Sequence, residues 1–149
     1  MSVPVQALSQ YVEVLDMRAQ QSQQAAGEAL RRVEHTKSQM ERLKRMAIGA
    51  GVKKSHGNVA LYVNAAGFRS GLQEMSEQCR DTLGVQQLEY AQAQVHMQAA
   101  LKQHDSMHFV LTQARNEIAL QQQRGEQKRM DELAGQAWLR QRRMSHSET

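Results

Sequence analysis

Residues 49–58, GAGVKKSHGN, form the one convincing break in a chain that is otherwise rich in helix-forming residues. Three glycines, at positions 49, 51 and 57, lie within this polar and basic stretch. Glycine disfavours a helix because it loses much backbone freedom when it is fixed there. We therefore expect a turn at about residues 49–57, with one helix on each side of it.

On the N-terminal side of this turn, every third and fourth residue forms a seam. Its members are Val5, Leu8, Val12, Leu15, Ala19, Ser22, Ala26, Ala29, Val33, Thr36, Met40, Leu43 and Ala47. The alternation of three and four does not break over about six heptads, which is the pattern of a coiled coil. The middle of the seam is small and partly polar. Each missing methylene forgoes about 0.8 kcal/mol of burial, so we expect this waist to hold less tightly than the ends. The pattern predicts a helix over about residues 5–48.

A second seam follows the turn. Its members are Phe68, Leu72, Met75, Cys79, Leu83, Gln86, Tyr90, Ala93, Met97, Ala100, His104, Met107, Leu111, Ala114 and Ile118. One step of four plus four, from Met75 through Cys79 to Leu83, indicates a stutter that relaxes the supercoil. The pattern predicts a helix over about residues 58–143. Because the chain contains no alternating run of β-branched residues, we expect no sheet and an all-α fold.

Two helices joined by about ten residues are expected to fold back as an antiparallel coiled-coil hairpin. With the turn centred near Lys53, the numbers of opposed residues add up to about 106, which places Val5 near Leu101. The second helix is then the longer and overhangs the first. Its seam residues Met107, Leu111 and Ile118 have no partner in this register, so we expect them to form a partner-binding surface. The overhang projects about 60 Å at 1.5 Å per residue. We expect one elongated domain over residues 1–149.

The composition supports long helices over a compact globule, since aromatic residues are only 4% and there is one proline. The net charge is +4, and its excess lies late in the chain, at Arg140, Arg142 and Arg143. Cys79 is the only cysteine, so no internal disulfide can form. The N-terminus lacks the basic start of a signal peptide, and no apolar run approaches about 18 residues. A soluble cytoplasmic protein is the default expectation.

Motifs that carry chemistry are weak in this sequence. HDSMH places His104 and His108 at the spacing of a metal-binding helix, but no third ligand is recognisable. GAGVKKS lacks the glycine that precedes the lysine of a phosphate loop. The arginines near the C-terminus have no interleaved aromatic residues of a nucleic-acid module. We expect no catalytic, cofactor or metal site, no small-molecule substrate and no nucleic-acid partner.

The stretch EQKRMDELAGQAWLRQRRM, residues 126–144, carries the only tryptophan of the chain. Met130, Leu133 and Trp138 follow helical spacing on one side. The helix predicted over residues 5–48 cannot reach them in the register above. Tryptophan is enriched at the energetic centres of protein interfaces. This side is therefore predicted to bind a partner, with the flanking charges, Asp131 and Glu132 among them, setting the orientation.

Two short stretches resemble a known family. QKRMDELAGQA, residues 127–137, resembles the C-terminal signature of the FliJ family of flagellar type III export proteins, which often reads Q-K-K-M-D-E-[FL]-A. YVNAAGFRSGL, residues 62–72, is similar to a family pattern that Asn64, Phe68 and Leu72 carry here. The length, the two helices and the position of the turn agree with the family along the whole chain.

The resemblance implies a non-enzymatic protein in the cytoplasm, peripherally associated with the inner membrane at the flagellar base. Family members bind the hexameric export ATPase as a central coiled-coil stalk. They also contact the cytoplasmic domain of the large export-gate membrane protein and engage export chaperones. The implied ATPase surface is the C-terminal one, and the implied gate surface is Phe68, Leu72 and Met75 near the hairpin tip. Two alternatives stay open: an injectisome stalk of the same architecture, and a structural coiled coil that self-associates through its overhang.

Overall fold

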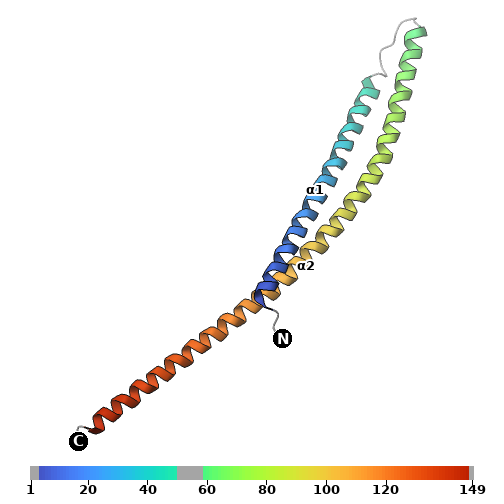
Figure 1. Cartoon of the computed structure of the whole chain (residues 1–149). Helices are drawn as coiled ribbons and strands as arrows, with labels where there is room; N and C mark the ends of the chain where they lie inside the picture. Colours follow the sequence, from blue (N-terminus) through green and yellow to red (C-terminus); the bar gives the residue numbers. More distant parts are fainter. Residues whose placement is uncertain (1–3, 50–58, 148–149) are drawn as a thin grey trace. The chain divides into compact units, whose positions relative to one another are not determined.

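The computed structural model describes residues 4–49 and 59–147, and all of them except Pro4 are helical. Helix α1 spans Val5–Gly49 and helix α2 spans Val59–Ser147, and the described residues contain no strand (Figure 1). The two-helix, all-α prediction is confirmed, with α2 the longer helix and with its end four residues later than the predicted 143. The turn was predicted at residues 49–57. Gly49 is the last residue of α1. The rest of the predicted turn falls within residues 50–58, which lie outside the described residues.

Contacts divide the chain into two units. The hairpin unit is Leu15–Gln103, and the terminal unit combines Met1–Val14 with His104–Thr149. The single domain predicted for residues 1–149 stays a prediction. Both helices contribute to each unit, and no helix in the described ranges is long and apolar enough to cross a membrane.

In the hairpin unit, α1 and α2 run antiparallel, side by side (Figure 1). The Thr36 hydroxyl donates a hydrogen bond of 2.6 Å to Oε1 of Gln86, and Thr36 is buried. An ion pair of 3.9 Å joins Arg32 to Glu89, although both side chains are more than half exposed and the pair therefore adds little stability. These two links show which residues of the two helices lie opposite each other.

The core of the hairpin unit follows the predicted seam of α1. Its buried side chains are Leu15, Ala19, Ala26, Ala29, Val33, Thr36 and Leu43 from α1 and Leu72 from α2. Every buried residue of α1 is a predicted seam residue, because a helix that packs along one partner buries the stripe that recurs every 3.5 residues. Ala47, the last predicted member, is exposed instead.

The predicted register is wrong. The residue numbers of the Thr36–Gln86 and Arg32–Glu89 pairs add up to about 122, not about 106. The prediction assumed that both helices end level with the turn. In the observed register, the last residue of α1 lies opposite about residue 73, so α2 begins several turns beyond the end of α1 (Figure 1). The apolar residues at the start of α2 are exposed accordingly, among them Val59, Tyr62 and Phe68.

The predicted stutter in α2 is also wrong. Met75 is 52% exposed, and its neighbour Ser76 is half-buried. With Ser76 in the seam, the steps from Leu72 alternate four and three without a break as far as Ala114. The error arose because the apolar Met75 was chosen over a serine, whereas the helical period and the packing of α1 decide which residue faces the partner.

In the terminal unit, the start of α1 packs on α2. The carbonyl of Pro4 accepts the first helical hydrogen bonds, from the amides of Ala7 and Leu8 at 2.9 and 3.2 Å. Val12 and Leu111 are 7% and 4% exposed. An Arg115 Nη2–H donates to Oγ of Ser9 at 3.3 Å. The numbers of these two opposed residues add up to 124, close to the sum of about 122 in the hairpin unit. Beyond Ala114, every described residue of α2 is exposed.

Candidate partner-binding surfaces

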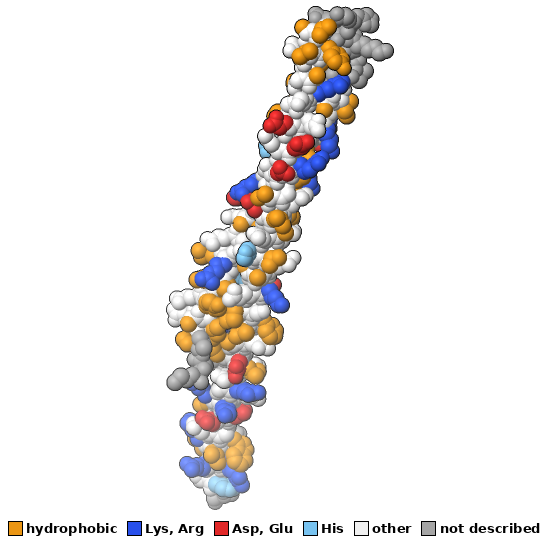
Figure 2. Space-filling model, turned by 90° about the vertical axis from the view of Figure 1, so that its right-hand side faces the viewer, with side chains coloured by type: hydrophobic (Ala, Val, Ile, Leu, Met, Phe, Trp, Pro, Cys, Tyr) orange, Lys and Arg blue, Asp and Glu red, His pale blue; other side chains and the backbone are white. Residues whose placement is uncertain are grey.

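The C-terminal surface, which consists of Met130, Leu133 and Trp138 with the flanking Asp131 and Glu132, lies on the exposed part of α2. Its three apolar side chains are 67%, 60% and 56% exposed. Their spacing of three and eight places them on one side of the helix. Exposed groups of large apolar side chains are one of the features by which candidate interaction sites are recognised, and this surface is therefore a candidate. Figure 2 shows hydrophobic side chains next to Lys and Arg side chains in this region, at the bottom of the view.

Trp138 has a charged neighbour on its own helix. The guanidinium carbon of Arg142 lies 5.1 Å from the centroid of the Trp138 ring, one helical turn further on. Such a cation–π contact at an exposed site is worth about 0.5–1 kcal/mol, which favours one orientation of the indole. This pairing was not predicted from the sequence, where Arg142 counted only toward the positive charge late in the chain. The spacing of four between Trp138 and Arg142 is the signal that could have found it.

A different side of the same helix carries Leu139, which is 51% exposed. It lines a shallow hollow of about 470 Å³ with Arg142, Arg143, His146 and Ser147. Leu139 is adjacent to Trp138 in sequence and similarly exposed, but it points to another side because successive residues are rotated by about 100°. The two residues are therefore a matched pair for testing which side binds.

The surface predicted near the hairpin tip divides into exposed and buried members. Phe68 and Met75 are 54% and 52% exposed, whereas Leu72 is 6% exposed and belongs to the core. Met75 lines an apolar pocket of about 240 Å³, whose other lining residues are Gln39, Arg42, Leu43, Met46 and Cys79. We call Phe68, Met75 and this pocket the hairpin-end surface. Met46, which lies on the facing helix and is 53% exposed, was not predicted as part of this surface.

The third predicted set was the seam of α2 beyond residue 101. Leu111 is buried and Met107 is half-buried, so the expectation that they have no partner in this chain is wrong. The reason is the register, since α1 reaches about 16 residues further along α2 than the turn midpoint suggested. Ile118, which is 41% exposed, is the most exposed of the three.

His104 and His108 are the residues at metal-binding spacing in the described part of α2. The rings of His104 and His108 lie 5.9 Å apart, and Nδ1 of His104 is 3.1 Å from Oδ1 of Asp105. In residues 4–49 and 59–147, no three metal-ligating side chains come together. The described residues instead present exposed apolar side chains with charged neighbours, and these are the candidate sites for partner proteins.

The fold and these surfaces define a two-helix coiled-coil protein whose longer helix leaves its final turns uncovered. Over residues 6–143 the sequence matches the model of a family described as the flagellar FliJ protein, and the chain belongs to the FliJ family. The same comparisons found no matching curated protein and no matching solved structure. The resemblance noted from the two short stretches is confirmed. The chain is a flagellar export-related protein of a non-enzymatic family.

Proposed function

We propose that this protein binds the flagellar export ATPase hexamer as a central coiled-coil stalk, through its C-terminal surface. The observation that carries the proposal is that Met130, Leu133 and Trp138 are all more than half exposed on one side of a helix, in a stretch where every described residue is exposed. Burying one such apolar side chain in a partner contributes about 1.5–3 kcal/mol. Asp131 and Glu132 lie between the apolar residues and orient the docked helix through charge complementarity.

The hairpin-end surface is proposed to contact the cytoplasmic domain of the export gate. Phe68 and Met75 are exposed, and the apolar pocket beside Met75 can accept a side chain from that domain. Leu72 supports this surface from inside the core and does not itself reach the gate. Binding at both surfaces would link the ATPase to the gate and hold the protein peripherally at the inner membrane.

Engagement of export chaperones is the third part of the proposal, and it rests on the family alone. The alternative of a self-associating coiled coil makes a different prediction, because exposed apolar residues such as Ile118 and Trp138 would then be covered by a second copy. Mass measurement in dilute solution separates the two, since a stalk protein is monomeric without its ATPase.

The test of the ATPase surface compares Trp138→Ala with Leu139→Ala. We expect Trp138→Ala to weaken binding to the purified ATPase by about 2 kcal/mol, the size typical of an interface hot spot, and Leu139→Ala to change it little. Isothermal titration calorimetry measures both. Equal losses in the two variants would refute a one-sided docking surface, and no loss in either would remove this segment from the interface.

A further inference from the structure

A second groove lies in the hairpin unit, between the end of α1 and α2, and its character differs from that of the apolar pocket beside Met75. It has a volume of about 550 Å³ and is lined by Leu43, Lys44, Ala47, Arg69, Leu72, Gln73, Ser76, Glu77 and Arg80. Ligand sites in proteins usually measure about 300–1,000 Å³, so the groove is large enough to accept several side chains.

The sequence explains why the helices leave space here. Counted back from Leu72 and forward to Cys79, the seam positions of α2 in this region are residues 69 and 76, an arginine and a serine. On the facing helix, Leu43 is followed in the seam by Ala47, whose side chain is a single methyl group. The small side chains of Ala47 and Ser76 do not fill the space between the two helices, and a groove remains over a floor formed by the buried Leu43 and Leu72. Arg69 lies at the end of this groove, beyond the residue of α2 that faces the end of α1.

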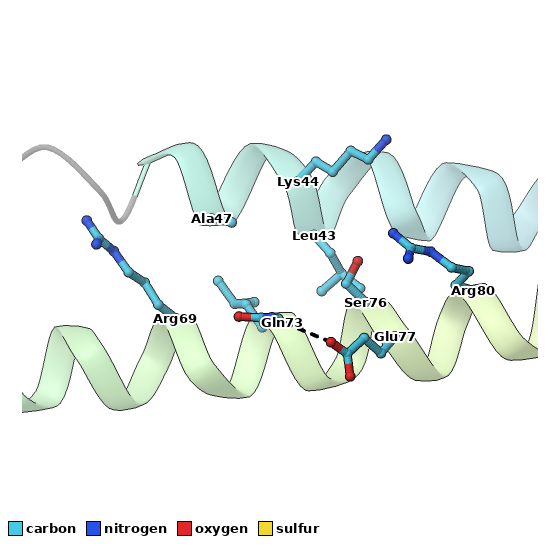
Figure 3. A pocket seen from close by; sticks show the side chains of 9 residues that line it. Leu43, Lys44, Ala47, Arg69, Gln73, Ser76, Glu77 and Arg80 are labelled. Atoms are coloured by element: carbon cyan, nitrogen blue, oxygen red, sulfur yellow. Dashed lines mark hydrogen bonds between the residues drawn. The ribbon is translucent and has the colours of Figure 1, made fainter.

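Positive charge predominates at the rim. Lys44, Arg69 and Arg80 are cationic, and Glu77 is the single acidic residue among the nine that line the groove. Figure 3 shows Arg80 extending from α2 toward α1 at one end of the groove, Arg69 extending from α2 past the end of α1 at the other, and Lys44 extending outward from α1. The Gln73 amide donates to Oε1 of Glu77 at 3.5 Å. Within the described residues, none of the three cations forms an ion pair or a side-chain hydrogen bond.

The geometry points to a docking site for an acidic amphipathic helix of a partner protein. Arg69 and Arg80 are eleven residues apart, which corresponds to about 16 Å along α2, or three helical turns. An incoming helix of that length can place apolar side chains on Leu43 and Leu72 and carboxylates beside the arginines at each end. Arginine pairs well with carboxylates because its planar fork donates two hydrogen bonds. A free anion such as phosphate would meet one arginine and leave the apolar floor uncovered.

This site goes beyond the proposed function, since its basic rim selects an acidic partner and its occupation needs neither the ATPase nor the gate, although it lies in the same hairpin unit as the proposed gate surface. Its occupant is recognised by negative charge and an apolar stripe together. The hairpin-end pocket beside Met75 shares Leu43 with it but selects an apolar partner.

The test uses the full chain and a synthetic helical peptide of about 18 residues, five turns long, with leucines on one face and glutamates on both flanks. A second peptide carries glutamine at every glutamate position. Fluorescence polarisation at fixed ionic strength measures the affinities. We expect the glutamate peptide to bind at least about tenfold more tightly than the glutamine peptide. Equal affinities, or displacement of the glutamate peptide by millimolar inorganic phosphate, would overturn the inference.

Variants locate the binding to the groove. The double variant Arg69→Glu/Arg80→Glu should weaken binding of the glutamate peptide at least about tenfold. The double variant Arg18→Glu/Arg31→Glu, which alters the formal charge equally at exposed positions of α1 outside the groove, should leave binding nearly unchanged. Equal weakening in both would show non-specific attraction and overturn the site.

A filling variant tests the groove without changing its charge. Ser76→Leu places a large apolar side chain at a seam position, so it should keep or raise the melting temperature while it abolishes peptide binding. A stable Ser76→Leu protein that still binds the glutamate peptide with full affinity would overturn the inference.

Discussion

Leu111 and Trp138 lie on the same helix, are both large and apolar, and meet opposite fates. Leu111 is 4% exposed because the start of α1 packs against it, whereas Trp138 is 56% exposed in a stretch where no described residue is buried. Helix propensity and composition do not separate the two regions. The presence of a second helix does, and the register of the hairpin decides where that helix stops. One region of α2 therefore contributes stability and the other is available for partners.

The largest expected effect is at the covered region. Leu111→Asp places a carboxylate in the core of the terminal unit and removes a buried leucine, which together should lower the free energy of unfolding by about 3–5 kcal/mol. Urea denaturation followed by circular dichroism measures this. Ile118→Asp, seven residues further along the same seam but 41% exposed, is the matched control and should cost under about 0.5 kcal/mol.

Two outcomes would contradict the expected difference in stability between the Leu111→Asp and Ile118→Asp variants. A Leu111→Asp variant of normal stability would mean that α1 does not cover this residue. A loss of several kcal/mol in Ile118→Asp would mean that α1 covers more of α2 than the Ser9–Arg115 link indicates.

The next largest effect distinguishes a buried residue from an exposed one at the hairpin end. Leu72→Ala should lower stability by about 2–5 kcal/mol, since Leu72 is buried, and Phe68→Ala should leave stability nearly unchanged while it weakens binding to the gate domain. Thermal melting and a pull-down titration with the purified gate domain measure the two quantities. A Phe68→Ala protein that melts early and loses all its partners together would show that Phe68 is part of the core.

A smaller effect is expected at the polar link in the seam. Gln86→Ala removes the acceptor of the buried Thr36 hydroxyl and should cost about 1–2 kcal/mol, limited by the ability of a helical threonine to donate to a carbonyl of its own helix. The double variant Thr36→Val/Gln86→Leu removes both partners and should recover the loss. If Gln86→Ala alone is fully stable, this hydrogen bond does not help to fix the register.

The seam of α1 could be predicted from the sequence because its 3–4 alternation is unbroken and one face of the helix packs along its whole length. All buried residues of α1 were identified in this way. The register could not be predicted, since it depends on which residues of the two helices fit together. The seam of one helix does not show where the other helix begins. The shift from about 106 to about 122 moved Leu111 from the predicted partner surface into the core.

The exposure of the candidate surface residues could be predicted where it depends on a single helix, while their binding role stays a prediction. Met130, Leu133 and Trp138 are exposed on one side as the spacing indicated, and the register error does not reach them because they lie beyond α1 in either register. At the hairpin end, the same sequence pattern combined Phe68 and Met75 with the buried Leu72, because helical spacing shows which residues share a face but not how deeply the facing helix covers each one. Met46 and the basic groove were missed for a related reason, since both depend on two helices meeting.

The measurement that tests this division of α2 most directly is a truncation after Arg124, followed by melting and by titration with the export ATPase. The removed segment contains the C-terminal surface and no buried residue among those described. The account predicts a melting temperature close to that of the full chain, together with loss of ATPase binding. A truncated protein that binds the ATPase with full affinity would contradict it, and so would one whose hairpin melts many degrees lower.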